Sequence, residues 1–111
     1  MNKINFAEKF KLFDEYWSPR IVGELNGQYI KLAKLKGVFV WHAHDIEDEY
    51  FHVIHGSIII HFRDGAVTIN EGESIIVPHG VEHKPEAPEE AHVMLFEPKS
   101  TPHTGNVESD H

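Results

Sequence analysis

Residues 37–56 read GVFVWHAHDIEDEYFHVIHG, and this stretch says most about the fold. In an extended strand successive side chains alternate between the two faces, so His42 and His44 point the same way, about 7 Å apart along the backbone. The polar run from Asp45 to Asp48 predicts a loop between two strands. A hairpin at this loop would return the carboxylate of Glu49 beside the two imidazoles. The spacing predicts a metal-binding geometry.

A second cluster, residues 72–83, reads GESIIVPHGVEH and ends in His83. Imidazole and carboxylate groups suit borderline divalent ions. We therefore predict one divalent metal ion per chain, Zn, Fe, Mn or Ni, held by four ligands: His42, His44, Glu49 and His83. Glu47 and Asp48 compete with Glu49 for the carboxylate role, because the loop could shift its register by one or two residues.

Histidine is abundant, with 10 in 111 residues, so a single histidine is weak evidence for a ligand. His55 precedes a turn and is left unassigned. For the rest outside the four ligands we expect solvated or packing roles: His52, His61, His79, His92, His103 and His111.

Composition limits the classes of function. A chain of 111 residues with 41% hydrophobic residues is long enough for one domain with a real core. The net charge of −8 offers no cationic surface for nucleic acid or an anionic membrane. The chain has no cysteine, which excludes disulfides, thiolate nucleophiles and cysteine–zinc sites. No stretch approaches the roughly 18 apolar residues of a membrane span, so we expect a cytoplasmic protein.

The chain divides into three segments. In segment 1–18, Asn5 followed by Glu8 resembles a capping box, and Phe6, Phe10 and Phe13 recur at helical spacing, which predicts a short amphipathic helix that closes one end of the core. Segment 19–98 shows strand patterns separated by turn signals, with a long loop expected at 78–90. The predicted strands are 20–25, 28–36, 38–44, 49–55, 57–62, 66–70, 73–77 and 91–96. Segment 99–111 is expected to be a polar tail. This pattern is typical of an all-β barrel or sandwich.

The glycines and the proline around the histidines resemble the cupin superfamily. The first cupin motif is matched by Gly37, His42, His44, Glu49 and Gly56, and the second by Gly72, Pro78, Gly80 and His83. Only four residues separate Gly37 from His42 where five are usual, and Ala87 stands where the second motif ends in asparagine. The resemblance implies a small, single-domain, bacterial-type cupin: a double-stranded β-helical, jelly-roll-like barrel with the metal inside one end.

Strand parity predicts which side chains line the barrel. The expected inward set is Val38, Val40, Phe51, Val53, Ile58, Ile60 and Phe62, giving an apolar cavity with the ion at its mouth. Large apolar side chains with outward parity need cover. Because Phe39, Trp41, Ile54 and Ile59 make up this outward set, we expect a homodimer formed through the outer sheet.

Two functions agree with these features. The first is a metal-dependent enzyme of the dioxygenase or isomerase type, acting on a small oxygenated compound, with no catalytic acid or base identified. The second is a non-catalytic, metal-dependent module that binds or senses a small molecule. A phosphorylated sugar is disfavoured, because only Lys84 stands next to a predicted ligand, although Lys31, Lys34 and Lys36 have no assigned face.

Overall fold

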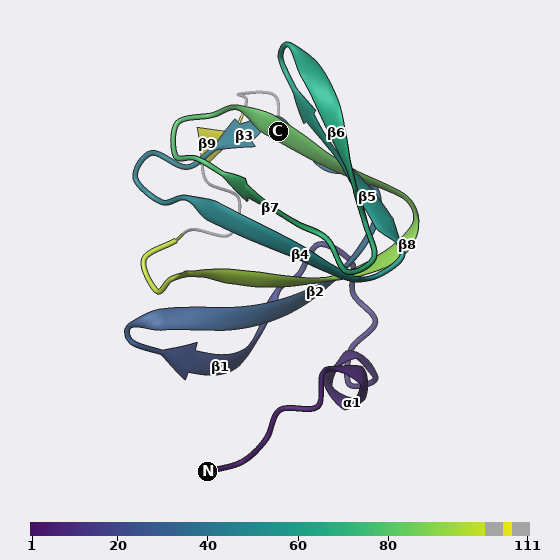
Figure 1. Ribbon diagram of the computed structural model, residues 1–111, viewed down its shortest axis with the longest axis vertical. Helices are drawn as coiled ribbons and strands as arrows, with labels where there is room; N and C mark the ends of the chain where they lie inside the picture. Colours follow the sequence, from purple (N-terminus) through teal and green to yellow (C-terminus); the bar gives the residue numbers. More distant parts are fainter. Residues whose placement is uncertain (102–105, 108–111) are drawn as a thin grey trace.

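The computed structural model describes residues 1–101 and 106–107. The described part contains one helix and nine strands in a single sheet (Figure 1). The elements are α1 (Phe6–Phe10), β1 (Arg20–Leu25), β2 (Gln28–Val38), β3 (His42–Ala43), β4 (Glu49–His55), β5 (Ser57–Phe62), β6 (Gly65–Asn70), β7 (Ser74–Val77), β8 (His83–Pro98) and β9 (Asn106–Val107). The named strands all pair antiparallel. The all-β cupin barrel with a short N-terminal helix is confirmed.

Strand β8 organises the sheet, since it pairs with β2, β3, β4 and β5. The prediction of a loop over 78–90 was wrong from His83 onward, because β8 already begins there. Prolines indicated a break, yet Pro85 pairs with Ile60, and its carbonyl accepts a hydrogen bond from the backbone N–H of Phe39. Proline has no backbone N–H to donate to a neighbouring strand. Its carbonyl can still accept, as the carbonyl of Pro85 does here.

The predicted strand 38–44 was also wrong. Strand β2 continues to Val38, and only His42 and Ala43 form β3. The register with β8 shifts between Leu35 and Gly37, and Gly37 has a φ of +84°, a conformation that favours glycine. This irregularity reverses the expected alternation. Val38 is 54% exposed rather than interior, and Phe39 turns toward the barrel cavity.

The alternation on β4 and β5 was predicted correctly. Phe51, Val53, Ile58 and Ile60 are buried in the main core, and Phe62 is half-buried against it. The same core takes residues from β2, β6, β7 and β8: Ala33, Leu35, Ile69, Val77, Ala87, Ala91, Val93 and Leu95. The barrel is therefore filled with side chains at one end, and the predicted metal ligands lie at the other.

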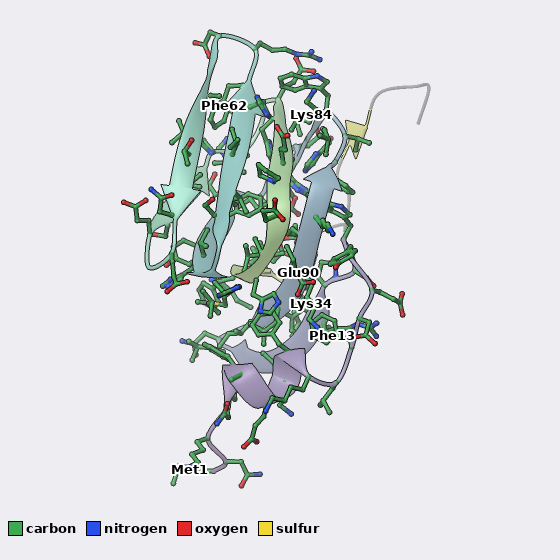
Figure 2. All side chains as sticks on the ribbon, turned by 90° about the vertical axis from the view of Figure 1, so that its right-hand side faces the viewer. Met1, Phe13, Lys34, Phe62, Lys84 and Glu90 are labelled. Atoms are coloured by element: carbon green, nitrogen blue, oxygen red, sulfur yellow. The ribbon has the colours of Figure 1, made fainter. Side chains whose placement is uncertain are left out.

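Helix α1 begins as predicted, with the Asn5 side chain accepting from the N–H of Glu8 at 3.0 Å. It lies on the outside of the sheet rather than over one end of the core (Figure 1). Phe10, Phe13 and Leu32 form a second, smaller hydrophobic cluster. Ile54 and Met94 pack against it. Figure 2 shows Phe13 beside Lys34, whose Nζ donates to the Phe13 carbonyl at 2.7 Å.

The segment predicted as a polar tail contains β9, which pairs with β3 through His42↔Val107 and Ala43↔Asn106. His103 and His111 lie outside the described residues. Over the residues that are described, the structure contains no helix with the length and apolar character needed to cross a membrane.

Candidate metal centre

The predicted ligands come from three strands that the topology brings to one place. His42 lies on β3, opposite His83 at the start of β8, and His44 follows β3 directly. Glu49 opens β4 after the loop 45–48. His42, His44 and Glu49 are buried, and their ligand atoms all lie within 4.8 Å of one another. The three residues therefore come together, but not through the expected hairpin, since β3 pairs with β8 and β9 and β4 pairs with β7 and β8.

The Glu49 carboxylate is the meeting point of the site. Its Oε1 atom lies 2.9 Å from Nε2 of His83, 3.5 Å from Nε2 of His44 and 4.0 Å from Nε2 of His42. Two atoms that each bind an ion at about 2.0–2.2 Å, at angles near 90–110°, lie about 3.0–3.5 Å apart. The His44 separation fits two ligands of one ion, the His42 separation of 4.0 Å is somewhat longer, and His83 joins the group through a hydrogen bond to Glu49.

Two of the histidines are oriented by the backbone. The Nδ1 atom of His42 lies 2.9 Å from the Val40 carbonyl oxygen, and Nδ1 of His83 lies 2.9 Å from that of Val81. A carbonyl oxygen can only accept, so Nδ1 carries the proton in both rings. In His42 this tautomer leaves the Nε2 lone pair free for a metal, as histidine ligands require, whereas Nε2 of His83 is hydrogen-bonded to Glu49 Oε1 at 2.9 Å.

His44 gives the strongest indication of a missing partner. Both of its ring nitrogens are buried and make no hydrogen bond in the structure, because the Glu49 oxygen at 3.5 Å is too far for a good one. Buried polar atoms are normally paired, and each unpaired one calls for an explanation. An ion bound between His44 and Glu49 would supply a partner for Nε2 of His44, the nitrogen that faces Glu49.

The titration behaviour of the cluster suits a cation. Burial lowers the pKa of His42 to about 4, which outweighs the hydrogen bond to the Val40 carbonyl and keeps the ring neutral. Burial opposes ionisation of Glu49 as well, but contacts with His44 and His83 outweigh it and lower the pKa of Glu49 to about 2. The site therefore presents a carboxylate and a neutral imidazole at pH 7.

The competing carboxylates have other partners. Glu47 is buried, and its Oε2 accepts from Ser100 Oγ at 3.1 Å. Asp48 is exposed and accepts from the backbone N–H of His79 at 2.9 Å. Glu49 is therefore the carboxylate that faces the imidazoles.

The remaining described histidines have partners away from the site, as expected. His52 contacts the Tyr50 hydroxyl, His61 contacts Glu86, His79 contacts Asp48 and His92 contacts Glu90, all between 2.8 and 3.0 Å. The unassigned His55 is exposed, 3.6 Å from Glu71. The acidic run 86–90, expected in a solvated loop, lies instead within β8.

A cavity of about 40 Å³ adjoins the ligands. Its wall is formed by Trp17, Pro19, Ala33, Leu35, Phe39, His42, Glu49, Phe51, Pro85, Val93 and Leu95. Apart from the two ligands, the only polar group on these side chains is the Trp17 indole N–H, which donates to the Lys36 carbonyl at 2.9 Å. The cavity is thus apolar with polarity concentrated at the predicted ion, as the sequence indicated, but with Phe39 in place of Val38.

Three residues near the site were not predicted. Trp17 reaches the cavity from the segment between α1 and β1, and no pattern in that segment indicates it. Lys31 and Glu97 form a buried ion pair on the inner face of the sheet. For Glu97 a signal existed, since it continues the alternation of Val93 and Leu95 on β8.

The family model of the cupin domain matches residues 29–97, more than half of the chain. The chain belongs to the cupin domain family. A cupin-2 domain containing protein from Shewanella frigidimarina NCIMB 400 is 49% identical, with a TM-score of 0.85 over 86% of this chain and 94% of that chain. Protein NMB1881 from Neisseria meningitidis is 32% identical, with a TM-score of 0.80 over 88% of this cupin and 100% of that protein.

Two further similarities are more distant. The uncharacterized protein YdbB of Bacillus subtilis (strain 168) is 31% identical over 64 residues, which are 57% of this chain. The match spans 57% of the length of that protein. A hydroquinone 1,2-dioxygenase, PnpCD, solved with Cd²⁺ and 4-hydroxybenzonitrile, is 16% identical with a TM-score of 0.69 over 83% of this cupin and 70% of that chain. At that identity the similarity shows the fold alone.

Proposed function

We propose that this cupin is a metal-dependent enzyme of the dioxygenase or isomerase type that acts on a small oxygenated compound. The observation that carries the proposal is that two members of the His42, His44 and Glu49 cluster, His42 and Glu49, line an apolar cavity. We include His83 as the fourth ligand, because its Nε2 lies 2.9 Å from the Glu49 carboxylate.

The ion, when bound, supplies Lewis-acid activation of a ligand oxygen, or oxygen chemistry where it is Fe(II). The protein's own backbone carbonyls orient the predicted ligands, and its apolar side chains keep water out. Val40 and Val81 carbonyls fix the His42 and His83 rings, while Phe51 and Leu95 wall the cavity. A compound that fits this cavity binds the metal through one or two oxygens and buries an apolar body.

The structure disfavours a phosphorylated sugar as the substrate. None of the described side chains around the cavity is Lys or Arg. Lys31 forms an ion pair with Glu97, and Lys84 lies over the Trp41 ring, 5.2 Å from its centroid. A phosphate group would find no cation to balance its charge.

The second candidate is a non-catalytic module that binds or senses a small molecule through its metal. One observation favours it: among the described residues that line the cavity, the only titratable groups are His42 and Glu49, both predicted ligands. An enzyme that moves a proton would need a further acid or base, or a ligating water, to do so.

Elemental analysis of protein purified by ion exchange identifies the metal. Calorimetry and turnover assays with catechol, acetylacetone and glucose 6-phosphate then test the proposal on the metal-loaded protein. We expect metal-dependent binding of the first two compounds and turnover of one chelating compound. Preferential turnover of the sugar phosphate would overturn the substrate class, and binding without turnover would favour the sensing module.

The proposal includes a homodimer in the cytoplasm. Three of the four side chains first expected to need cover do not support it. Phe39 faces the cavity, Ile54 packs under Phe10, and Trp41 is covered by Arg63. A different outer-sheet groove carries the dimer proposal, lined by Ile30, Ile46, Tyr50, Ile76, Met94 and Phe96 among others. A second copy of this sheet face would cover it with two-fold symmetry.

A further inference from the structure

The mouth of the cavity is defined by exposure. Of the eleven described residues that line it, eight are buried and three are half-buried. The half-buried residues are Trp17, Pro19 and Phe39. Any ligand that reaches His42 and Glu49 through this cavity has to pass between these three residues.

The closed cavity is too small for an organic ligand. Its volume is about 40 Å³, room for a water-sized group, whereas pockets that bury a ligand span about 300–1,000 Å³. Seven of the lining residues belong to the barrel core or to the metal cluster, and Pro85 is buried within β8. Movement that admits a ligand therefore has to come from the mouth.

All three mouth residues lie outside the named strands, and Trp17, with Pro19, lies on the irregular segment between α1 and β1. It is held by two hydrogen bonds to β2, from its backbone N–H to the Lys34 carbonyl and from Nε1 to the Lys36 carbonyl, both at 2.9 Å. Its φ of +59° is unfavourable for a bulky residue. Strained backbone of this kind recurs at ligand clamps and switch segments.

The indole ring stacks on Phe39, with ring centroids 4.8 Å apart and planes inclined by 15°. Phe39 in turn meets the His42 ring edge-on, with centroids 5.4 Å apart and planes at 86°. Phe39 thus presents one flat face to the mouth and stands directly beside a metal ligand. A planar ring that reaches the ion while stacked on Phe39 would occupy the place of the indole.

We propose that Trp17 is the gate and specificity-determining side chain of this cavity, and that the ligand is a flat aromatic compound with a metal-chelating oxygen group whose ring replaces the indole against Phe39. This inference rests on the proposed metal site and narrows its ligand class. Non-aromatic chelators of the same metal-binding group reach the ion without the stacking contact.

Benzohydroxamate and acetohydroxamate test the inference, since they share a chelating group and differ in the aromatic ring. Calorimetry on the metal-loaded protein should show benzohydroxamate binding at least about tenfold more tightly. Phe39→Leu should reduce that preference by about two- to tenfold. Trp17→Ala, which removes the closed state, should raise the apparent affinity for benzohydroxamate at least about threefold.

Fluorescence of the Trp41→Phe variant provides a second readout that needs no change at the mouth. Trp17 is then the sole tryptophan of the chain, and its emission should shift to the red when benzohydroxamate displaces it, and should shift less with acetohydroxamate, which does not stack on Phe39. Trp41 is a suitable position for the change because it lies outside the cavity, 3.9 Å from Arg63.

The outcomes separate the two proposals. If neither hydroxamate binds the metal-loaded protein, the proposed metal site and the gate both fail. If both bind equally and the Trp17 emission does not move, the metal site stands and the gate is overturned. Two results together would also overturn the gate and make Trp17 a fixed wall. They are a benzohydroxamate preference that survives unchanged in Trp17→Ala and Trp17→Gly, and a Trp17 emission that stays constant in the Trp41→Phe variant.

Discussion

The Nζ atom of Lys31 lies 2.7 Å from Oε1 of Glu97 inside the barrel, where the two side chains are 12% and 4% exposed. Burial raises the pKa of Glu97, and the charge of Glu49 raises it further, whereas Lys31 lowers it. Lys31 thus compensates a second carboxylate close to the predicted metal ligands. A buried pair of this kind is costly to break, because the remaining charge has no partner.

The first prediction concerns this ion pair. Lys31→Met should reduce the free energy of unfolding by about 3–5 kcal/mol, since Glu97 is left buried and unpaired. Urea denaturation measures the loss. Lys99→Met is the matched control, because its pair with Glu24 is 47% and 52% exposed and contributes at most about 1 kcal/mol. Equal losses in the two variants would contradict the prediction, and adding Glu97→Gln to Lys31→Met should restore stability.

The second prediction concerns the ligand set. His42→Ala and His83→Ala should each weaken metal binding by more than about a hundredfold. Changing a residue that only hydrogen-bonds to a ligand already lowers metal affinity by about 10–100-fold. Competition titration with a chromogenic chelator measures the affinity, and circular dichroism checks that the barrel is folded. His79→Ala is the control, since His79 contacts Asp48 rather than the cluster. Stoichiometric metal in the His42→Ala, His44→Ala double variant would disprove the site.

The third prediction is the pH dependence of metal binding. Burial disfavours the charged form of His44, but neighbouring carboxylates, Glu49 above all, outweigh it and raise its pKa. Protons therefore compete with the metal at His44 first, and affinity should fall about tenfold per pH unit below that pKa. His42, with its pKa lowered to about 4, should add a second proton only in more acidic solution. An affinity that stays constant between about pH 5 and 8 would refute this order of protonation.

The fourth prediction compares two glycines with the same backbone conformation. Gly56 has a φ of +82° and Gly72 a φ of +83°. A Cβ at Gly56 would lie 3.1 Å from the Glu90 carbonyl oxygen and 3.3 Å from Ala91 Cα, whereas at Gly72 it would meet nothing within 4 Å. Gly72→Ala should cost about 1–2 kcal/mol from backbone strain alone. Gly56→Ala should cost measurably more in thermal denaturation, and equal melting temperatures would show that β8 yields without penalty.

The fifth prediction concerns assembly. Ile76 is 63% exposed within the outer-sheet groove, so Ile76→Lys should convert the proposed dimer to a monomer, because it puts a charged side chain in place of an apolar contact at the interface. Light scattering at micromolar concentration gives the mass. Val67→Lys, at a 43% exposed position on β6 outside the groove, should leave the dimer intact. A monomeric mass for the unmodified protein would contradict the proposed interface.

Local spacing was sufficient to predict much of the candidate site. The strands β3 and β4 are joined through their shared partner β8, yet the spacing from His42 to His44 is local, so strand alternation alone fixes their common face. The same holds for the interior residues of β4 and β5, which lie between regular turns. These features depend on neighbours within a few residues, which a sequence displays directly.

Features set by distant pairing could not be predicted in this way. The irregularity at Gly37 reverses the parity of Phe39, and it depends on the register between β2 and β8. The entry of Pro85 into β8 depends on its pairing with Ile60. Trp17 reaches the cavity because an irregular segment crosses to β2, which no periodicity encodes.

The central position of β8 constrains the order in which this protein can fold during its synthesis. Every strand that β8 pairs with, β2 to β5, is synthesised before it, and His83 is its first residue. Until β8 has emerged from the ribosome, β2 has only its hairpin partner β1, and β4 only β7. Non-local pairing of this type is slow and leaves strand edges exposed during synthesis. Barrel closure and complete assembly of the four-residue cluster should therefore follow synthesis of His83–Pro98, so that the nascent chain acquires its metal late.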